Sequence, residues 1–482
     1  MSLATSNVRW VLLSQGIKVI CQMISIVVLA RLLPAESYGV MALATVATGL
    51  AYLFRDLGSS AAIIQAREIS PSLVSTVHWA NVGLGVLLGI SLAALAPLLA
   101  SVFREEQLTS VLLLLSIAFP ISCISIVHQA LLERESRFEV VVIAEVCAAV
   151  LGVTIAVIAA WFGAGVYSLV LQVLVTTITA TLIIILRSPY RAQWEWSSRE
   201  FSSILGFSGN LSLFNFVNYF ARNADSMVIG RLLGAGALGV YSLAYRLMLF
   251  PVQNLTFVSA RALLPVLSRK QDQPSESGEL YLKAVSLIAF LSAPLMAGLF
   301  TLRELFVSVT LGEKWHAVGG VLFWLAPVGF IQSMVSTTGS VSTACGRTDI
   351  LLRLGIFGTL LQVSSFLIGS RWGIEGVAGG YLVANVINAV PALYFTGKLV
   401  GVSVLGLAKR VAPPVCVSLL MVAALLGTLP VVGGLFVDKR LQLLALVMVG
   451  MTAYSAFSLM FMRDRCLAMR RALWKSRQDD SA

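Results

Sequence analysis

Apolar runs of about 20 residues recur along almost the whole chain, each long enough for a helix to cross a hydrocarbon core of about 30 Å. Runs this continuous predict α-helices rather than the alternating strands of a membrane barrel, because backbone groups in lipid must be hydrogen-bonded within the segment. The pattern predicts fourteen spans, at 8–31, 38–64, 76–102, 108–132, 140–162, 165–186, 204–230, 239–265, 283–310, 318–343, 351–370, 375–397, 411–430 and 441–462.

Prolines lie inside several of these spans, among them Pro120 in 108–132 and Pro327 in 318–343. Neighbouring helices and hydroxyl side chains can satisfy the backbone groups that a proline frees inside a membrane helix. Both runs are therefore expected to be single spans, and the fold class is an all-α polytopic membrane protein.

The composition supports the bilayer as solvent, because 58% of the residues are hydrophobic and only 12% are charged, against about 25% in soluble domains. The net charge of +11 is the kind of value that nucleic-acid-binding proteins show. Here, however, most basic residues lie in the C-terminal tail and in short loops on one side of the membrane, as basic residues that determine topology do. They predict that both termini are cytoplasmic, and no nucleic-acid partner is expected.

Nothing in the sequence predicts a metal, a disulfide or a cofactor. The six cysteines are scattered without CxxC spacing, and the three histidines are far apart. The segment Gly234–Gly239 matches GxGxxG, but no strand precedes it, so it does not indicate a dinucleotide site. The short loops provide no extramembrane domain for chemistry, and the chain is not expected to be an enzyme.

Two short echoes indicate an internal repeat. Arg31-Leu32-Leu33 followed by Gly39-Val40 recurs as Arg231-Leu232-Leu233 followed by Gly239-Val240, and the loop 162–166 resembles 372–377. The echoes join spans one and two with seven and eight, and spans five and six with eleven and twelve. Two six-helix bundles of parallel topology would produce this arrangement. The expected organisation is an N-terminal lobe at 1–190, a second lobe at 191–400, and two additional helices with a basic tail at 401–482.

Polar and ionisable side chains inside the predicted spans are the candidate functional residues, because they are costly in lipid. In the first span, Gln15, Lys18 and Gln22 follow i, i+3, i+7 spacing and share one helix face. Lys18 has no acid near it in the sequence. The second span carries Tyr52 and Arg55, with Asp56 adjacent.

The seventh span carries Asn218, Arg222 and Asp225 on one stripe, the eighth carries Arg246, and the fifth carries Glu145. Local explanations exist for several of these charges. Arg55 could pair with Asp56, Arg222 could pair with Asp225 at i, i+3, and Arg246 could extend to the membrane interface.

The stripes occupy equivalent helices of the two predicted halves, so a shared water-filled cleft would explain their placement. Its bases outnumber its acids, and Arg and Lys are the usual phosphate ligands, which favours an anionic, hydroxyl-rich cargo. The predicted substrate-binding residues are Lys18, Arg55, Arg222, Arg246, Gln15, Gln22, Tyr52 and Asn218. The predicted ion-coupling residues are Asp56, Asp225 and Glu145.

The chain resembles the polysaccharide-exporter (Wzx-type) branch of the MOP, or MATE-like, flippase superfamily. The segment 30–39 (ARLLPAESYG) looks like that branch's first external loop, and 54–58 (FRDLG) followed by 62–65 (AIIQ) is similar to its second-helix signature. The length, span number, two halves and cytoplasmic termini agree with it over the whole chain.

The resemblance implies a flippase of the bacterial inner membrane for undecaprenyl-pyrophosphate-linked oligosaccharide, the repeat unit of O-antigen, capsule or exopolysaccharide. It also implies alternating access coupled to an ion gradient, and cavity bases on helices one and two, to which Lys18 and Arg55 correspond. Partnership with a polysaccharide polymerase and a chain-length regulator is implied by the family alone.

Three other functions stay open from the sequence. A multidrug exporter of the same fold would need cavity acids on its N-terminal helices, where only Asp56 and Glu145 qualify. A lipid II flippase would share the fold. A membrane glycan polymerase or glycosyltransferase would use acids, bases or histidines on external loops, which are short here.

Overall fold

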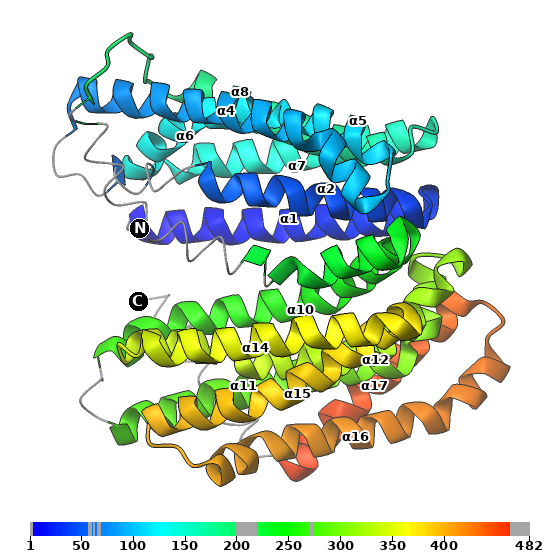
Figure 1. The fold of residues 1–482 in the computed structure, drawn as a ribbon. Coiled ribbons are helices and arrows are strands. Elements are labelled where there is room, and N and C mark those ends of the chain that lie inside the picture. The colour runs from blue at the N-terminus through cyan, green and yellow to red at the C-terminus, as the bar shows by residue number, and fades with distance from the viewer. Residues whose placement is uncertain are drawn as a thin grey trace. The chain divides into compact units, whose positions relative to one another are not determined.

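The computed structural model describes residues 3–55, 60, 63–64, 69–198, 200, 219–220, 222–269 and 274–462, and the regular elements of this part are helices. They divide into two compact units, Met1–Ser242 and Leu243–Ala482, whose boundary falls within α10. Figure 1 shows the long helices of each unit running alongside one another.

The first unit contains α1 (Leu3–Leu32), α2 (Ala35–Phe54), α4 (Pro71–Phe103), α5 (Gln107–Ser116), α6 (Ala118–Arg134), α7 (Phe138–Trp161), α8 (Val166–Arg187) and the start of α10 (Gly234–Arg269). The second unit continues with α11 (Pro274–Thr310), α12 (His316–Val335), α13 (Thr337–Ala344), α14 (Thr348–Gly369), α15 (Gly373–Leu399), α16 (Val404–Leu435) and α17 (Lys439–Phe461). Both α16 and α17 pack on α11. The lobe boundaries at 190 and 400 stay a prediction.

Twelve stretches of the described residues are long and apolar enough to cross a membrane. One of them, Asp349–Leu399, contains two helices that are each long enough to cross a membrane, α14 and α15, which pack against each other. The predicted span 204–230 lies mostly outside the described residues. The count of fourteen is therefore close to the structure without being confirmed by it.

Two predicted spans are each divided into two helices, contrary to the expectation of single spans. The run 108–132 is divided between α5 and α6 at Ile117, just before Pro120, which has no N–H to donate to a preceding carbonyl. The run 318–343 continues through Pro327 and is divided at Ser336 instead. No proline stands at this break. The Ser336 and Thr337 hydroxyls bond to carbonyls three residues earlier (2.7 and 3.0 Å), a bond that Ser333 also makes inside α12 without interrupting the helix.

Of the predicted span 38–64, the structure describes residues 38–55, 60 and 63–64. Helix α2 ends at Phe54, and the charged Arg55 lies in a bend. The Arg55 N–H bonds to the carbonyl of Tyr52 at 3.3 Å, three residues back, so the α-helical bonding has already changed there.

The internal repeat has a structural counterpart within each unit. Helices α7 and α14 begin at equivalent positions, 138 and 348, and each follows a residue with positive φ, Ser136 (58°) and Gly346 (66°). Each is also followed by a left-handed glycine, Gly163 (φ 80°) and Gly373 (φ 72°). Divided fourth helices occur in both halves as well. These shared details support duplication of a six-helix unit.

The first pair of repeated segments, around Gly39 and Gly239, forms a close helix contact within the first unit. A Cβ at Gly39 would lie 1.7 Å from the carbonyl oxygen of Ala235, and a Cβ at Gly239 would lie 1.8 Å from that of Ala35. The two equivalent segments therefore meet reciprocally through Ala-x-x-x-Gly motifs. Small residues at this spacing allow two helix backbones to approach closely.

Candidate functional site

The polar stripe of α1 lies on an accessible surface of the first unit. Gln15 and Gln22 are exposed, and the Lys18 side chain is 35% exposed. Charged and amide groups at membrane depth are tolerated where they line water or contact protein rather than lipid. Their exposure inside a span supports a water-filled surface along α1.

Lys18 is paired with an acid, contrary to the expectation from its sequence neighbourhood. Its Nζ donates to the Glu145 Oε2 of α7 at 2.7 Å, and the Glu145 side chain is 41% exposed. The packing of α1 on α7 brings together two residues 127 positions apart. The predicted substrate ligand and the predicted ion-coupling acid thus form one accessible ion pair.

Arg55 lies against an aromatic ring at the end of α2. Its guanidinium carbon is 5.3 Å from the centroid of the Tyr52 ring, within the range of cation–π attraction. The Tyr52 ring in turn packs on Phe119, with centroids 4.8 Å apart. Asp56 lies outside the described residues, so the alternative Arg55–Asp56 pair is not tested.

In the helical segment 222–232, the predicted stripe divides into one exposed and one buried charge. Arg222 is exposed, whereas Asp225 is only 6% exposed. The Asp225 carboxylate accepts from the Ser226 N–H at 2.6 Å and from the Tyr241 hydroxyl at 3.2 Å. Among the ion pairs of the described residues, none joins Arg222 to Asp225.

The last two predicted substrate-binding residues are Arg246 and Asn218. Arg246 is half-buried on α10 in the second unit, and Asn218 lies outside the described residues. The structure therefore groups Lys18 with Glu145 and Arg55 with Tyr52. The shared cleft that would unite all of these residues stays a prediction.

Sequence reasoning missed Tyr219, a tyrosine of the predicted seventh span that bonds to α2. The Tyr219 hydroxyl donates to the carbonyl of Val46 at 2.7 Å, and a Cβ at Gly49 would lie 2.3 Å from that hydroxyl oxygen. A hydrogen bond between α8 and α1 was also missed, in which the Gln172 amide nitrogen donates to the Ser25 hydroxyl oxygen at 3.1 Å. The available signal for Tyr219 was Gly49, because a glycine on a helix leaves room for a side chain of a neighbouring helix.

The segment 188–198, here called the connector, leaves α8 and docks on the start of α4. The carbonyl of Gln193 accepts from Ser75 and from the Trp79 indole (2.8 Å), and the Trp194 ring stacks on Trp79 with centroids 3.9 Å apart. Tyr190 packs edge-on against His128 at 5.1 Å, and burial raises the pKa of its hydroxyl. The connector is thus a built part of the first unit.

A Trp79→Ala variant is expected to free the connector, because it removes both the stacking and an indole hydrogen bond. Trypsin should cleave after Arg191 about fivefold faster or more, as local opening costs less free energy. Limited proteolysis of the purified protein measures this. Trp161→Ala, which alters an exposed tryptophan at the end of α7, is the control. Equal cleavage rates in both variants would contradict the docking role.

Comparison with known proteins places these features in a family. The family model described as "Polysaccharide biosynthesis protein" matches residues 28–319. The lipopolysaccharide biosynthesis protein WzxC of Escherichia coli is 29% identical, over 80% of this chain and 79% of that protein. The teichuronic acid biosynthesis protein TuaB of Bacillus subtilis is 27% identical, over 81% of this chain and 84% of its own length.

Solved structures show the same fold at low identity. The lipid II flippase MurJ, in an inward closed conformation, superposes with a TM-score of 0.74 at 15% identity, over 94% of this chain and 99% of that chain. An inward-facing MATE multidrug transporter of the MOP superfamily gives 0.61 at 18% identity, over 80% and 94%. The all-α polytopic MOP fold is thereby confirmed. The family model matches more than half of the residues of this chain, so the chain belongs to the polysaccharide biosynthesis protein family.

Proposed function

We propose that this protein moves an anionic, polyprenyl-pyrophosphate-linked oligosaccharide from the cytoplasmic to the opposite leaflet of the bacterial inner membrane. The observation that carries the proposal is membership of the polysaccharide biosynthesis family on a fold that a lipid II flippase shares. Relatives named for lipopolysaccharide, teichuronic acid, amylovoran and succinoglycan suggest a glycan repeat unit as cargo. The succinoglycan relative, ExoT of Rhizobium meliloti, is called a transport protein.

The accessible cations support a cargo with a pyrophosphate group. Lys18 is partly exposed and Arg222 is exposed, both inside predicted spans. Arg55 is half-buried beside Tyr52. An Arg fork and a Lys ammonium donate strong, charge-assisted hydrogen bonds to phosphate oxygens. The transport involves no bond making, so no catalytic residue is proposed.

Ion coupling is assigned in this proposal to the acids Glu145 and Asp225. Glu145 bonds Lys18, so a proton on Glu145 would release the lysine ammonium toward the pyrophosphate. Asp225 is buried and hydrogen-bonded by neutral groups, which leaves it able to exchange a proton or bind a cation. The proposal puts both termini in the cytoplasm, and the excess of basic residues in the loops assigned to that side supports it.

Deletion of the gene tests the transport step directly. We expect loss of surface polysaccharide together with accumulation of intact lipid-linked repeat units in the cytoplasmic leaflet. Units that reach the outer leaflet but stay unpolymerised would contradict the proposal and point to a later enzymatic step. Rescue of a strain depleted of its peptidoglycan flippase would instead identify lipid II as the cargo.

An Arg55→Ala variant should lower export about tenfold or more, because a charged hydrogen bond to phosphate is worth about 1.5–3 kcal/mol. Arg55→Lys should retain part of the activity, since the charge stays and the bidentate geometry is lost. The measurement is surface polysaccharide in the deletion strain carrying each variant at equal membrane levels. Arg440→Ala, at an exposed helix start, is the matched control. Normal export by Arg55→Ala would reject its role as a substrate ligand.

A further inference from the structure

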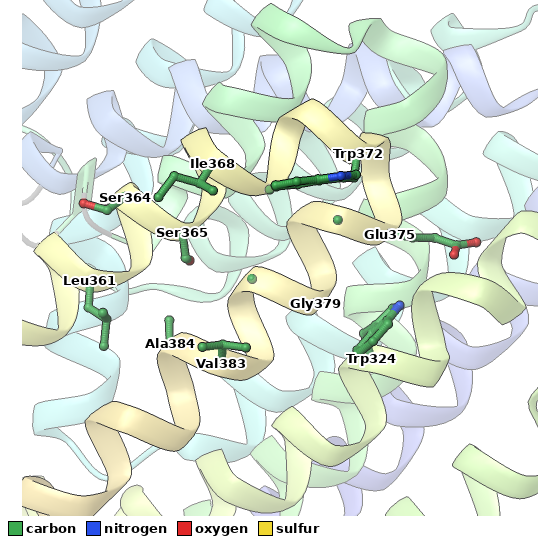
Figure 2. Close-up of a pocket in the computed structure, with 13 residues that line it drawn as sticks. Trp324, Leu361, Ser364, Ser365, Ile368, Trp372, Glu375, Gly379, Val383 and Ala384 are labelled. Atoms are coloured by element: carbon green, nitrogen blue, oxygen red, sulfur yellow. The ribbon is translucent and has the colours of Figure 1, made fainter.

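A groove of about 660 Å³ lies on the second unit, along α14 and α15 and beside Trp324 of α12. Its volume falls within the range of about 300–1,000 Å³ that small-molecule sites occupy. Figure 2 shows Trp324, Trp372 and Glu375 at one end and Leu361 with Ala384 at the other. None of the residues assigned above to the glycan cargo lines it.

Glycines determine the shape of this groove. Gly369 and Gly376 let α14 and α15 approach closely, since a Cβ at either would lie within 2.4 Å of the other's carbonyl oxygen. Gly379 differs, because a Cβ there would lie 3.5 Å from the Trp324 ring, an ordinary van der Waals contact. A methyl group would therefore fit at Gly379, whereas a longer side chain would enter the space in front of Trp324.

The body of the groove is apolar and opens toward lipid. Ile368 is 58% exposed and Val383 is 57% exposed, and both belong to helices apolar enough to cross a membrane. Trp372 is 70% exposed in the short turn Ser370–Trp372 between α14 and α15, and tryptophans at helix ends mark a membrane interface. These features fit a hydrocarbon chain that lies along the helices with its polar head at the Trp372 end.

Among the residues that line the groove, Glu375 is the one with a charged side chain. Glu375 is exposed in the first turn of α15, and it forms no ion pair with any residue of the described part. A carboxylate beside apolar surface at a membrane interface is stabilised by a cation. Trp324 and Trp372 flank it, and indole faces also attract ammonium groups.

We propose that this groove binds a zwitterionic aminophospholipid, with an acyl chain along α14 and α15 and the headgroup ammonium between Glu375 and the two indoles. An anionic polyprenyl pyrophosphate is disfavoured there, because Glu375 would repel it. The groove is thus a lipid site separate from the route of the proposed glycan cargo. It lies at the non-cytoplasmic end of α14 and α15 in the predicted topology, so the lipid comes from the outer leaflet.

Native mass spectrometry of the purified full-length protein, with phosphatidylethanolamine or phosphatidylglycerol added, tests this site. The wild-type protein should retain phosphatidylethanolamine about three- to tenfold more strongly, the effect of one partly exposed charge with cation–π contacts. Glu375→Gln should abolish this preference, and Gly379→Leu should reduce binding of both lipids by filling the groove.

Two matched variants control for unspecific effects. Glu304→Gln removes another exposed acid, and Gly427→Leu adds the same side chain at an open position on α16. Both should bind lipid as the wild type does. Equal retention of the two lipids by the wild type, or an unchanged preference in Glu375→Gln, would overturn the proposal. Because Glu375 is exposed, its variant remains informative even if Gly379→Leu does not fold. Lipid retention is measured without glycan export, so failure of one proposal leaves the other standing.

Discussion

Gly39→Val is expected to destabilise the protein by about 3 kcal/mol, at the upper end of the usual cost of overpacking. A Cβ at this position would lie 1.7 Å from the Ala235 carbonyl oxygen, and the obstructing atom belongs to a backbone that cannot rotate away. The two segments must therefore separate, and the contacts around them are lost. Thermal unfolding of the purified protein in detergent measures the effect.

The repeat provides an internal check on this prediction. Gly239→Val should have an effect of similar size, because its Cβ would lie 1.8 Å from the equivalent carbonyl of Ala35. The double variant should cost less than the sum of the two, since both changes open the same contact. Gly83→Val, at an open and exposed position on α4, is the control. If Gly39→Val melts like Gly83→Val, the close contact does not exist in the folded protein.

Lys18→Ala should lower polysaccharide export about tenfold or more and also reduce stability. It leaves Glu145 without its cation, and loss of one partner costs about 3–5 kcal/mol in fully buried pairs. The cost here should be smaller, because both side chains are more than a third exposed. Melting temperature and surface polysaccharide are measured on the same set of variants.

The double variant Lys18→Ala with Glu145→Ala separates a structural role from a substrate-binding role. Removing both charges should restore stability, since no unpaired charge is left in the membrane. Export should stay low if Lys18 binds the anionic cargo or Glu145 couples the ions, the two functional roles proposed above. Recovery of export in the double variant would mean that the pair only holds α1 to α7. Lys439→Ala, which breaks an exposed pair with Glu313, should change neither quantity.

The sequence predicted the class of fold because hydrophobic length is a local property. A run long enough to cross the bilayer can be recognised without knowing its neighbours, and the helices of the described part agree with most predicted spans. The repeat was also readable, because duplication keeps residue spacing, as the equivalent starts of α7 and α14 show. Family membership rested on the same kind of local signature.

Helix interruptions were less predictable, because they follow neither from hydrophobicity nor from the position of a proline alone. Pro120 and Pro327 each lie inside a predicted span. Helix α12 nevertheless continues through Pro327, whereas the break between α5 and α6 precedes Pro120. Helix α12 ends at Val335 without a proline at the break.

The sequence by itself determined that this chain is a multi-pass helical membrane protein with two related halves and costly polar residues inside its spans. Only the tertiary structure decided the partners of those residues. Lys18 pairs with Glu145 across 127 positions, and Asp225 bonds Tyr241 rather than Arg222. Helix periodicity tells which face a side chain occupies, but the neighbour on that face depends on how helices distant in the chain pack together.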